Sequence, residues 1–186
     1  MNIDKQNMDI EQFTIAVSNE LLATEISQLP AAIETVLSLY LPYFSVQRMT
    51  IFRLTKEELF EDAITVAADK QQQVKLPQQG ITSPHLENIK KGEIIQTADG
   101  IETLMDDAEI ELLQMHGVIS HIAVPFRIHG QIWGGIAASR YQPPAKWQPA
   151  TITAIRQLGQ LLAATYERYD YWQKLQLKNQ QLKLLM

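Results

Sequence analysis

Histidine is the residue type in this chain best suited to acid–base or ligand chemistry near neutral pH, and its four copies are scattered. His85 lies in the first turn of an expected helix, and His116 closes another, where a cation complements the helix dipole. His121 falls inside an expected strand, where we expect a partly buried structural histidine, and His129 lies at an expected hairpin turn. No spacing of metal ligands accompanies them, so we predict no metal site. His85 or His116 could offer an axial haem ligand, which we disfavour, or a polar contact to a small molecule.

Signs of catalysis are missing. The chain has no cysteine, which excludes disulfides, thiolate metal sites and a cysteine nucleophile. It also lacks the serine elbow G-x-S-x-G, the phosphate loop, G-x-G-x-x-G and H-E-x-x-H. The acidic neighbours Asp106 and Asp107 fit a solvated loop. We therefore predict that this chain is not itself an enzyme.

Composition indicates one globular domain. The chain has 186 residues, of which 46% are apolar and 20% charged, enough for a single sizeable core. Its net charge of −5 provides no basic surface for nucleic acid. No apolar run reaches the ~18 residues of a membrane span, and the N-terminus lacks the apolar core of a signal peptide. We expect a cytoplasmic protein without nucleic-acid or membrane partners.

Hydrophobic spacing then predicts the elements that hold these side chains. A helix from about Gln6 to Ile26 is broken at Leu29-Pro30, and a second begins at Pro30 and stops before Pro42. The sequence predicts strands at Val46–Leu54, Leu59–Ala67 and Glu93–Gln96, short helices at Ser83–Gly92 and Ala108–His116, and two long strands that meet at His129-Gly130. This order predicts one α+β domain with helical extensions at both ends.

The last predicted helix runs from Pro149 to Met186, roughly 57 Å, which is longer than one small core can cover. Its distal part has a series of residues at alternating 4- and 3-residue steps, which indicates a coiled-coil seam that is polar in its first half, with Asn179 at a core position that could fix the register. The seam consists of Leu161, Thr165, Arg168, Trp172, Leu175, Asn179, Leu182 and Met186. We predict a homodimer through the terminal helices, with an interface of Phe13, Val17, Leu161, Trp172, Leu175, Asn179 and Leu182. The chain ends within this pattern, so we expect a larger protein to continue beyond it.

A run of motifs in the second half carries a family resemblance. Gly117–Ser120, Val124–Phe126, Gly130–Ile136 and Lys146-Trp147 resemble, in order and spacing, the C-terminal half of a GAF domain, a small-molecule-sensing signalling module. The resemblance extends over about Ser18–Tyr166. It implies a central antiparallel sheet with helices on one face and ligand-covering segments on the other. We divide the chain into an N-terminal helical extension (1–17), a GAF-like domain (18–166) and a C-terminal coiled-coil helix (167–186). We expect the whole segment to be the N-terminal input domain of a larger bacterial signalling protein.

The resemblance also implies a pocket between the sheet and a lid formed by Gly80–Gly92 and Ala98–Gly117. The candidate pocket residues are Phe52, Thr82, His85, Leu86, Met105, Leu112, Met115, His116, Ile122 and Val124. The Asn-Lys…Phe…Asp-Glu signature of cyclic-nucleotide-binding relatives is missing, which disfavours cyclic nucleotides. Because some relatives attach a bilin to a cysteine, we expect that no covalent bilin is possible here. The identity of the ligand stays open.

Two functions compete at this point. The first is a sensory domain that binds a small ligand and signals through a dimeric coiled coil to a downstream output domain, such as a kinase or cyclase. The alternative is a structural dimerisation module whose pocket is collapsed and holds no ligand.

Overall fold

A computed structural model describes residues 9–55, 60–69, 83–98 and 107–184. The helices and strands follow in the order α1 (Ile10–Ala23), η1 (Ile26–Gln28), α2 (Leu29–Tyr43), β1 (Arg48–Leu54), β2 (Phe60–Ala67), α3 (Ser83–Lys91), β3 (Ile95–Ala98), α4 (Asp107–Met115), β4 (Ser120–Ile128), β5 (Gln131–Arg140) and α5 (Pro149–Leu184). The expected α+β class and the long C-terminal helix are confirmed.

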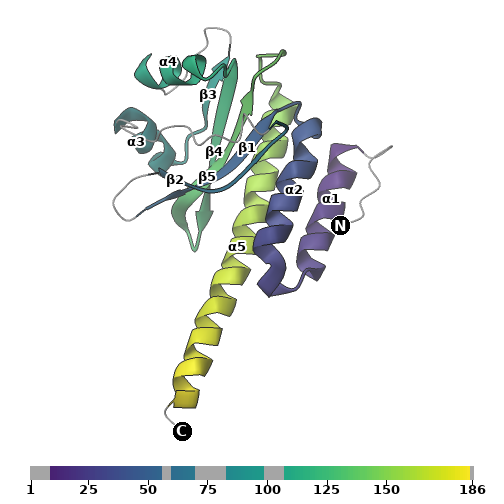
Figure 1. The fold of residues 1–186 in the computed structure, drawn as a ribbon, viewed down its shortest axis with the longest axis vertical. Helices are drawn as coiled ribbons and strands as arrows, with labels where there is room; N and C mark the ends of the chain where they lie inside the picture. The colour runs from purple at the N-terminus through teal and green to yellow at the C-terminus, as the bar shows by residue number, and fades with distance from the viewer. Residues whose placement is uncertain (1–8, 56–59, 70–82, 99–106, 185–186) are drawn as a thin grey trace.

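The strands form one five-stranded sheet in the order β2-β1-β5-β4-β3, and every neighbouring pair is antiparallel. Figure 1 shows α1, α2 and α5 side by side on one side of this sheet, with α3 and α4 on the other. Helices α2 and α5 contact the strands, and α1 packs against α2 and α5. The lower part of α5 extends well beyond the domain (Figure 1). Within the described residues no helix is long and apolar enough to cross a membrane.

Most predicted elements lie within a few residues of their observed bounds, and one of the differences involves a proline. Helix α2 was predicted to stop before Pro42, but it continues through that residue to Tyr43. Pro42 lies in the last turn, where its ring and missing N–H disturb few helical hydrogen bonds. At the other end of α2, Pro30 stands in the first turn as expected.

The main core lies between the sheet and the three long helices. Helix α1 buries Phe13, Val17 and Leu21 completely or almost so. The Phe13 ring stacks on Tyr43 at 4.1 Å between centroids and meets Tyr40 edge-on at 4.8 Å. Phe13 and Val17 were predicted at a dimer interface, and this prediction is wrong because the helices of one chain already enclose both side chains.

Arg140 fastens the segment that leads into α5. Its buried guanidinium donates hydrogen bonds to four backbone carbonyls, those of Phe44, Ser45, Pro144 and Lys146, at 2.9–3.1 Å. The same group lies 4.0 Å from the centre of the Trp147 ring, a cation–π contact. These contacts join the end of α2 to the start of α5 and so set where the long helix begins.

Candidate ligand-binding face and output helix

The two faces of the sheet differ in chemistry. Side chains alternate along a strand, and those of Met49, Ile51, Ile122, Val124, Ile136 and Ala138 belong to the core under the long helices; we call this the helix face. The opposite surface, which we call the lid face, carries Arg48, Thr50, Phe52, His121, Ala123, Ala137 and Ser139. Ile122 and Val124 were predicted to line the pocket beneath the lid. That prediction is wrong by one residue of register, because Ala123 between them is the residue that faces α3.

One part of the lid face is apolar and small. Phe52, Ile95, Ala123 and Ala137 pack there with Ile89 of α3, and Leu86 of the same helix is partly buried against them. This cluster confirms that α3 lies over the sheet and places two predicted pocket residues, Phe52 and Leu86, together on the lid face.

The other part of the lid face is polar, and its central residue was not predicted. Arg48 is only 3% exposed, and its guanidinium bonds to Asp62 at 3.3 Å. The Nε atom of Arg48 is buried, and none of the residues that the structure describes offers it a hydrogen-bond partner. Burying an ion is costly unless it is paired and hydrogen-bonded, so a half-satisfied guanidinium marks a place where a further acceptor would fit. The sequence signal that could have identified this residue is a basic side chain at the start of the otherwise mostly apolar strand β1.

Hydroxyl and imidazole groups accompany Arg48. Thr50 and Thr65 share a hydrogen bond of 3.2 Å across β1 and β2. His121 Nδ1 lies 3.0 Å from Ser139 Oγ across β4 and β5. The expectation that His121 is a partly buried structural histidine agrees with this pairing. The lid face therefore combines an apolar area with buried polar groups, the composition of a small-molecule site.

The remaining predicted pocket residues are not all brought together. Met115, at the end of α4, is 77% exposed, and His116 is also exposed. Thr82 and Met105 lie outside the described residues. The backbones of His85 and Leu112 belong to α3 and α4, but their side chains lie outside the described part of the chain.

A separate groove of about 500 Å³ lies between β4 and α5. Val124 and Phe126 line it from the strand, and Ala163, Ala164 and Glu167 from the helix. Val124, predicted to lie beneath the lid, therefore borders a cavity on the opposite side of the sheet.

The sheet and α5 are joined by a row of aromatic rings. Trp133 of β5 stacks on Phe126 of β4, with centroids 5.5 Å apart, and lies 4.7 Å from the ring of Tyr166 on α5. Burial raises the pKa of Tyr166 to about 12, an effect that the nearby positive charge of Arg53 partly opposes. The sheet therefore contacts α5 directly through these three rings.

Helix α5 also holds the end of α1. The guanidinium of Arg168 donates hydrogen bonds of 2.7–3.4 Å to the carbonyls of Leu21, Leu22 and Thr24. These are carbonyls that a helix end leaves without intrahelical partners. Arg168 was expected in a coiled-coil seam, but it binds within its own chain.

The predicted dimer residues farther along α5 remain accessible. Leu175 and Leu182 are 57% and 60% exposed, and Asn179 between them is exposed. Trp172 is partly buried and stacks on Tyr169, with centroids 5.9 Å apart. Leu161, nearer the domain, packs against the main core. The part of the predicted interface that a partner can reach is thus the distal one.

The GAF domain family model matches residues 28–166. The chain belongs to the GAF domain family. No curated protein matches it. Among solved structures, the phycoerythrobilin-bound GAF domain of a cyanobacterial phytochrome is similar with a TM-score of 0.75 and 12% identity, over 90% of this chain and 99% of that one. The corresponding phycocyanobilin-bound domain, also from a cyanobacterial phytochrome, has a TM-score of 0.71 and 12% identity, with 88% and 96% of the chains covered.

The GAF domain of PixJ from Thermosynechococcus elongatus, in its blue-light-absorbing form, has a TM-score of 0.63 and 15% identity, over 94% of this GAF chain and 96% of that one. A further neighbour was solved with bound biliverdin. The expectation on cofactors, which excluded a covalently bound bilin and left the cofactor otherwise unknown, is therefore corrected. The absence of cysteine removes a thioether bond, but domains of this fold hold bilins, so a bilin belongs among the ligands to consider.

Proposed function

We propose that this chain is a sensory domain that binds a small molecule on the lid face and transmits its state through α5. In this proposal two copies associate through the distal part of α5 and carry the signal to a downstream output domain. The family match and the photosensory neighbours support the sensory role.

The observation that carries the ligand proposal is Arg48. A face built only for packing would have apolar side chains there, as the helix face does. Instead the lid face buries a guanidinium that, within the described ranges, pairs with one carboxylate, Asp62, and leaves Nε without a hydrogen-bond partner. An acidic group on a ligand would supply the missing acceptor, and a guanidinium binds carboxylates in a fixed two-point geometry.

The chemical groups of a bilin match those of this surface. Its propionate groups match the Arg48 guanidinium, and its conjugated rings match the apolar area around Phe52, Ala123 and Ala137. Bound here, a bilin would supply light absorption, while the protein would orient it and exclude water. Because the chain has no cysteine, the pigment would be held without a thioether bond.

The distal part of α5 supports the dimer. Beyond the domain, Leu175 and Leu182 leave large apolar side chains in solvent, and with Asn179 they keep the 4- and 3-residue spacing of a coiled coil. A second copy of the same helix would bury them in a symmetric interface. A ligand that prefers one arrangement of these helices would then bias the output.

One observation favours the alternative of a structural dimerisation module. Phe52 is only 7% exposed and occupies the apolar area of the lid face itself. If no ligand displaces or joins this ring, the domain would serve for dimerisation alone.

Native mass spectrometry of the purified chain, before and after addition of biliverdin, tests both parts. We expect a dimer that retains one biliverdin per chain. Arg48→Met combined with Asp62→Asn removes both buried charges together, so neither remains unpaired; this variant should stay dimeric and lose the pigment. Arg53→Met, at an exposed arginine of the same strand, is the matched control. Leu175→Asp with Leu182→Asp should give a monomer that still binds.

Several outcomes would contradict the proposal. If the Arg48→Met/Asp62→Asn variant retained as much biliverdin as the wild type, Arg48 would not be part of the binding site. A wild-type dimer that carries neither biliverdin nor a co-purified small molecule would favour the structural module. A monomer at high protein concentration would remove the proposed route of transmission.

A further inference from the structure

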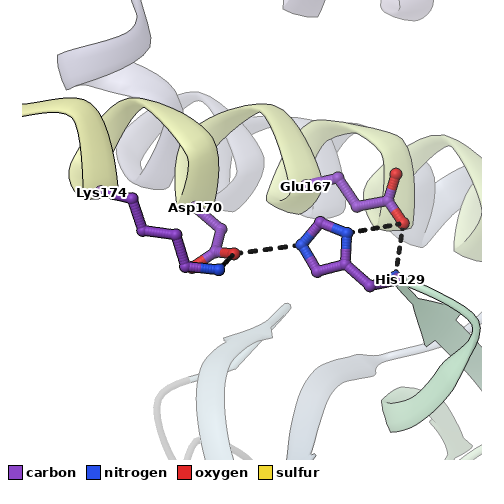
Figure 2. Close-up of polar contacts among 4 residues, drawn as sticks. All are labelled: His129, Glu167, Asp170 and Lys174. Carbon is purple, nitrogen blue, oxygen red and sulfur yellow. Dashed lines mark hydrogen bonds and ion pairs between the residues drawn. The ribbon is translucent and has the colours of Figure 1, made fainter.

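The tip of the β4–β5 hairpin contacts α5 at the point where the helix leaves the domain. The turn consists of His129 and Gly130, which both have positive φ, +50° and +77°. Histidine tolerates this backbone region better than most residues other than glycine. Figure 2 shows the His129 side chain lying against α5, between Glu167 and Asp170, with Lys174 one turn farther along.

Three contacts join His129 to the helix. Its backbone N–H donates to Glu167 Oε1 at 2.7 Å. Its ring Nε2 lies 3.1 Å from Asp170 Oδ2, and Nδ1 lies 3.9 Å from Glu167 Oε1 (Figure 2). The edge of the ring also meets Tyr171, with centroids 5.1 Å apart. One histidine thus bridges two turns of α5.

The strength of these contacts depends on the charge of the ring. A neutral imidazole carries a proton on one nitrogen only, and with that proton on Nε2 it still donates to Asp170 at 3.1 Å. The 3.9 Å contact of Nδ1 with Glu167 is an ion pair only when the ring is protonated. The imidazolium form therefore adds attraction to Glu167 and makes the hydrogen bond to Asp170 a charge-assisted one.

The surrounding charges are those of α5 and of the hairpin itself. On the helix, Lys174 bonds to the same Asp170 oxygen at 2.6 Å, and Glu167 and Tyr171 complete the contacts of the ring. On the hairpin, the Arg127 guanidinium bonds to the carbonyl of Gly130. Hydrogen bonds from Lys174 and then His129 lower the pKa of Asp170 below its usual value, so this carboxylate remains charged throughout the range in which an imidazole titrates.

We propose that His129 is a pH-dependent clasp that holds the exit of α5 to the sheet when its ring is protonated and loosens when the ring is neutral. The aromatic contact of Trp133 with Tyr166 lies next to Glu167 on the helix and does not titrate near neutral pH. Loosening therefore affects the turns of α5 from Glu167 outward.

The consequence for signalling rests on the proposed role of α5 as the output helix, but the clasp itself does not. Acidification would stiffen the connection between the sheet and the distal helix, so that a change at the sheet reaches the helix more directly. A pH effect on any output would then be added to that of the ligand on the lid face.

Amide hydrogen exchange of the ligand-free chain tests the clasp directly. We compare protection of residues 128–131 and 167–175 at about pH 6 and about pH 8, corrected for the intrinsic pH dependence of exchange. The wild type should be about two- to fivefold more protected at the lower pH, the range expected for exposed ion pairs. His129→Asn tolerates positive φ and does not titrate, so its corrected protection should be the same at both values. His116→Gln, at an exposed histidine just after α4, should behave as the wild type does.

Asp170→Asn provides a second variant, in which the backbone hydrogen bond from His129 to Glu167 remains. Its pH response should be smaller than that of the wild type. The clasp is refuted if the wild type shows no corrected pH response, or if His129→Asn keeps the full response. Because no ligand is present in these measurements, their failure would leave the ligand proposal standing, and loss of biliverdin binding would leave the clasp standing.

Discussion

The helix face and the lid face use the same strands in opposite ways. The helix face joins nearly continuous apolar side chains to α1, α2 and α5, and it includes fully buried residues such as Ile51, Ile122 and Ile136. The lid face has a much smaller apolar cluster, and its other buried side chains are polar: Arg48, Thr50, His121 and Ser139. The difference indicates that one face supplies most of the apolar contacts that stabilise the fold, and that the other can carry polar groups.

Truncation of one buried side chain on each side gives the largest expected contrast. Leu158 of α5 and Ile89 of α3 are both fully buried, the first in the main core and the second in the lid-face cluster. Leu158→Ala should lower the free energy of unfolding by about 2–5 kcal/mol. Ile89→Ala should mainly release α3, with a smaller loss in global stability and a clear loss of amide protection in that helix.

Urea denaturation measures the free energy of unfolding of both variants, and hydrogen exchange measures the amide protection of α3. Equal losses of global stability from the two variants would show that the lid-face cluster belongs to the same cooperative core. The conclusion that the helix face contributes most of the stability would then be incorrect.

The next largest effect is expected at Gly135, which pairs with Phe52 across β1 and β5. A Cβ atom added there would lie 2.5 Å from Cζ of Phe52 and 2.6 Å from the carbonyl oxygen of Val124. Gly135→Ala must therefore displace the Phe52 ring on the lid face or shift β4. We expect a loss of about 1–3 kcal/mol, as for other overpacked sites. Gly159→Ala on α5 is the control, because its nearest neighbour would be Phe126 at an ordinary 3.7 Å.

The double variant Gly135→Ala/Phe52→Leu sharpens this test. If the Phe52 ring is the main obstacle, the shorter side chain should recover part of the lost stability. A loss unchanged by Phe52→Leu would assign the clash to the backbone of β4 and not to the lid face.

Local patterns in the sequence were sufficient for the elements and the family, but not for the pairing of distant groups. The run of apolar residues in β4 is buried on both faces, so it does not show which residues face the lid, and Ile122 and Val124 were assigned to the wrong side. Phe13 and Val17 follow a helical spacing that a second chain or the same chain could cover equally well. Their burial against Tyr40 and Tyr43 depends on how α1 docks onto α2.

The same limit applies to charged groups. His129 lies 38 residues from Glu167 and 41 from Asp170, and nothing in either segment alone indicates that they meet. Arg48 was visible as a charge at the start of an apolar strand, but its burial against Asp62 follows from the hairpin register of β1 and β2. Residues that act through long-range contacts were therefore those that the sequence did not single out.

The smallest expected effect concerns Tyr166, on the helix face. Its pKa is raised to about 12 because burial disfavours the charged phenolate. An unfolded tyrosine ionises near pH 10, so the folded state binds the proton more tightly and is destabilised as the pH rises from about 10 toward 12. Relative to Tyr166→Phe, the wild type should lose about 1 kcal/mol by pH 11 and nothing below pH 9. Urea denaturation at about pH 9 and about pH 11 measures this difference, and Tyr171→Phe, at an exposed tyrosine of the same helix, is the control. The same alkaline loss in Tyr166→Phe and in the wild type would show that this ring is not sealed between the sheet and α5, and the aromatic connection between them would have to be reconsidered.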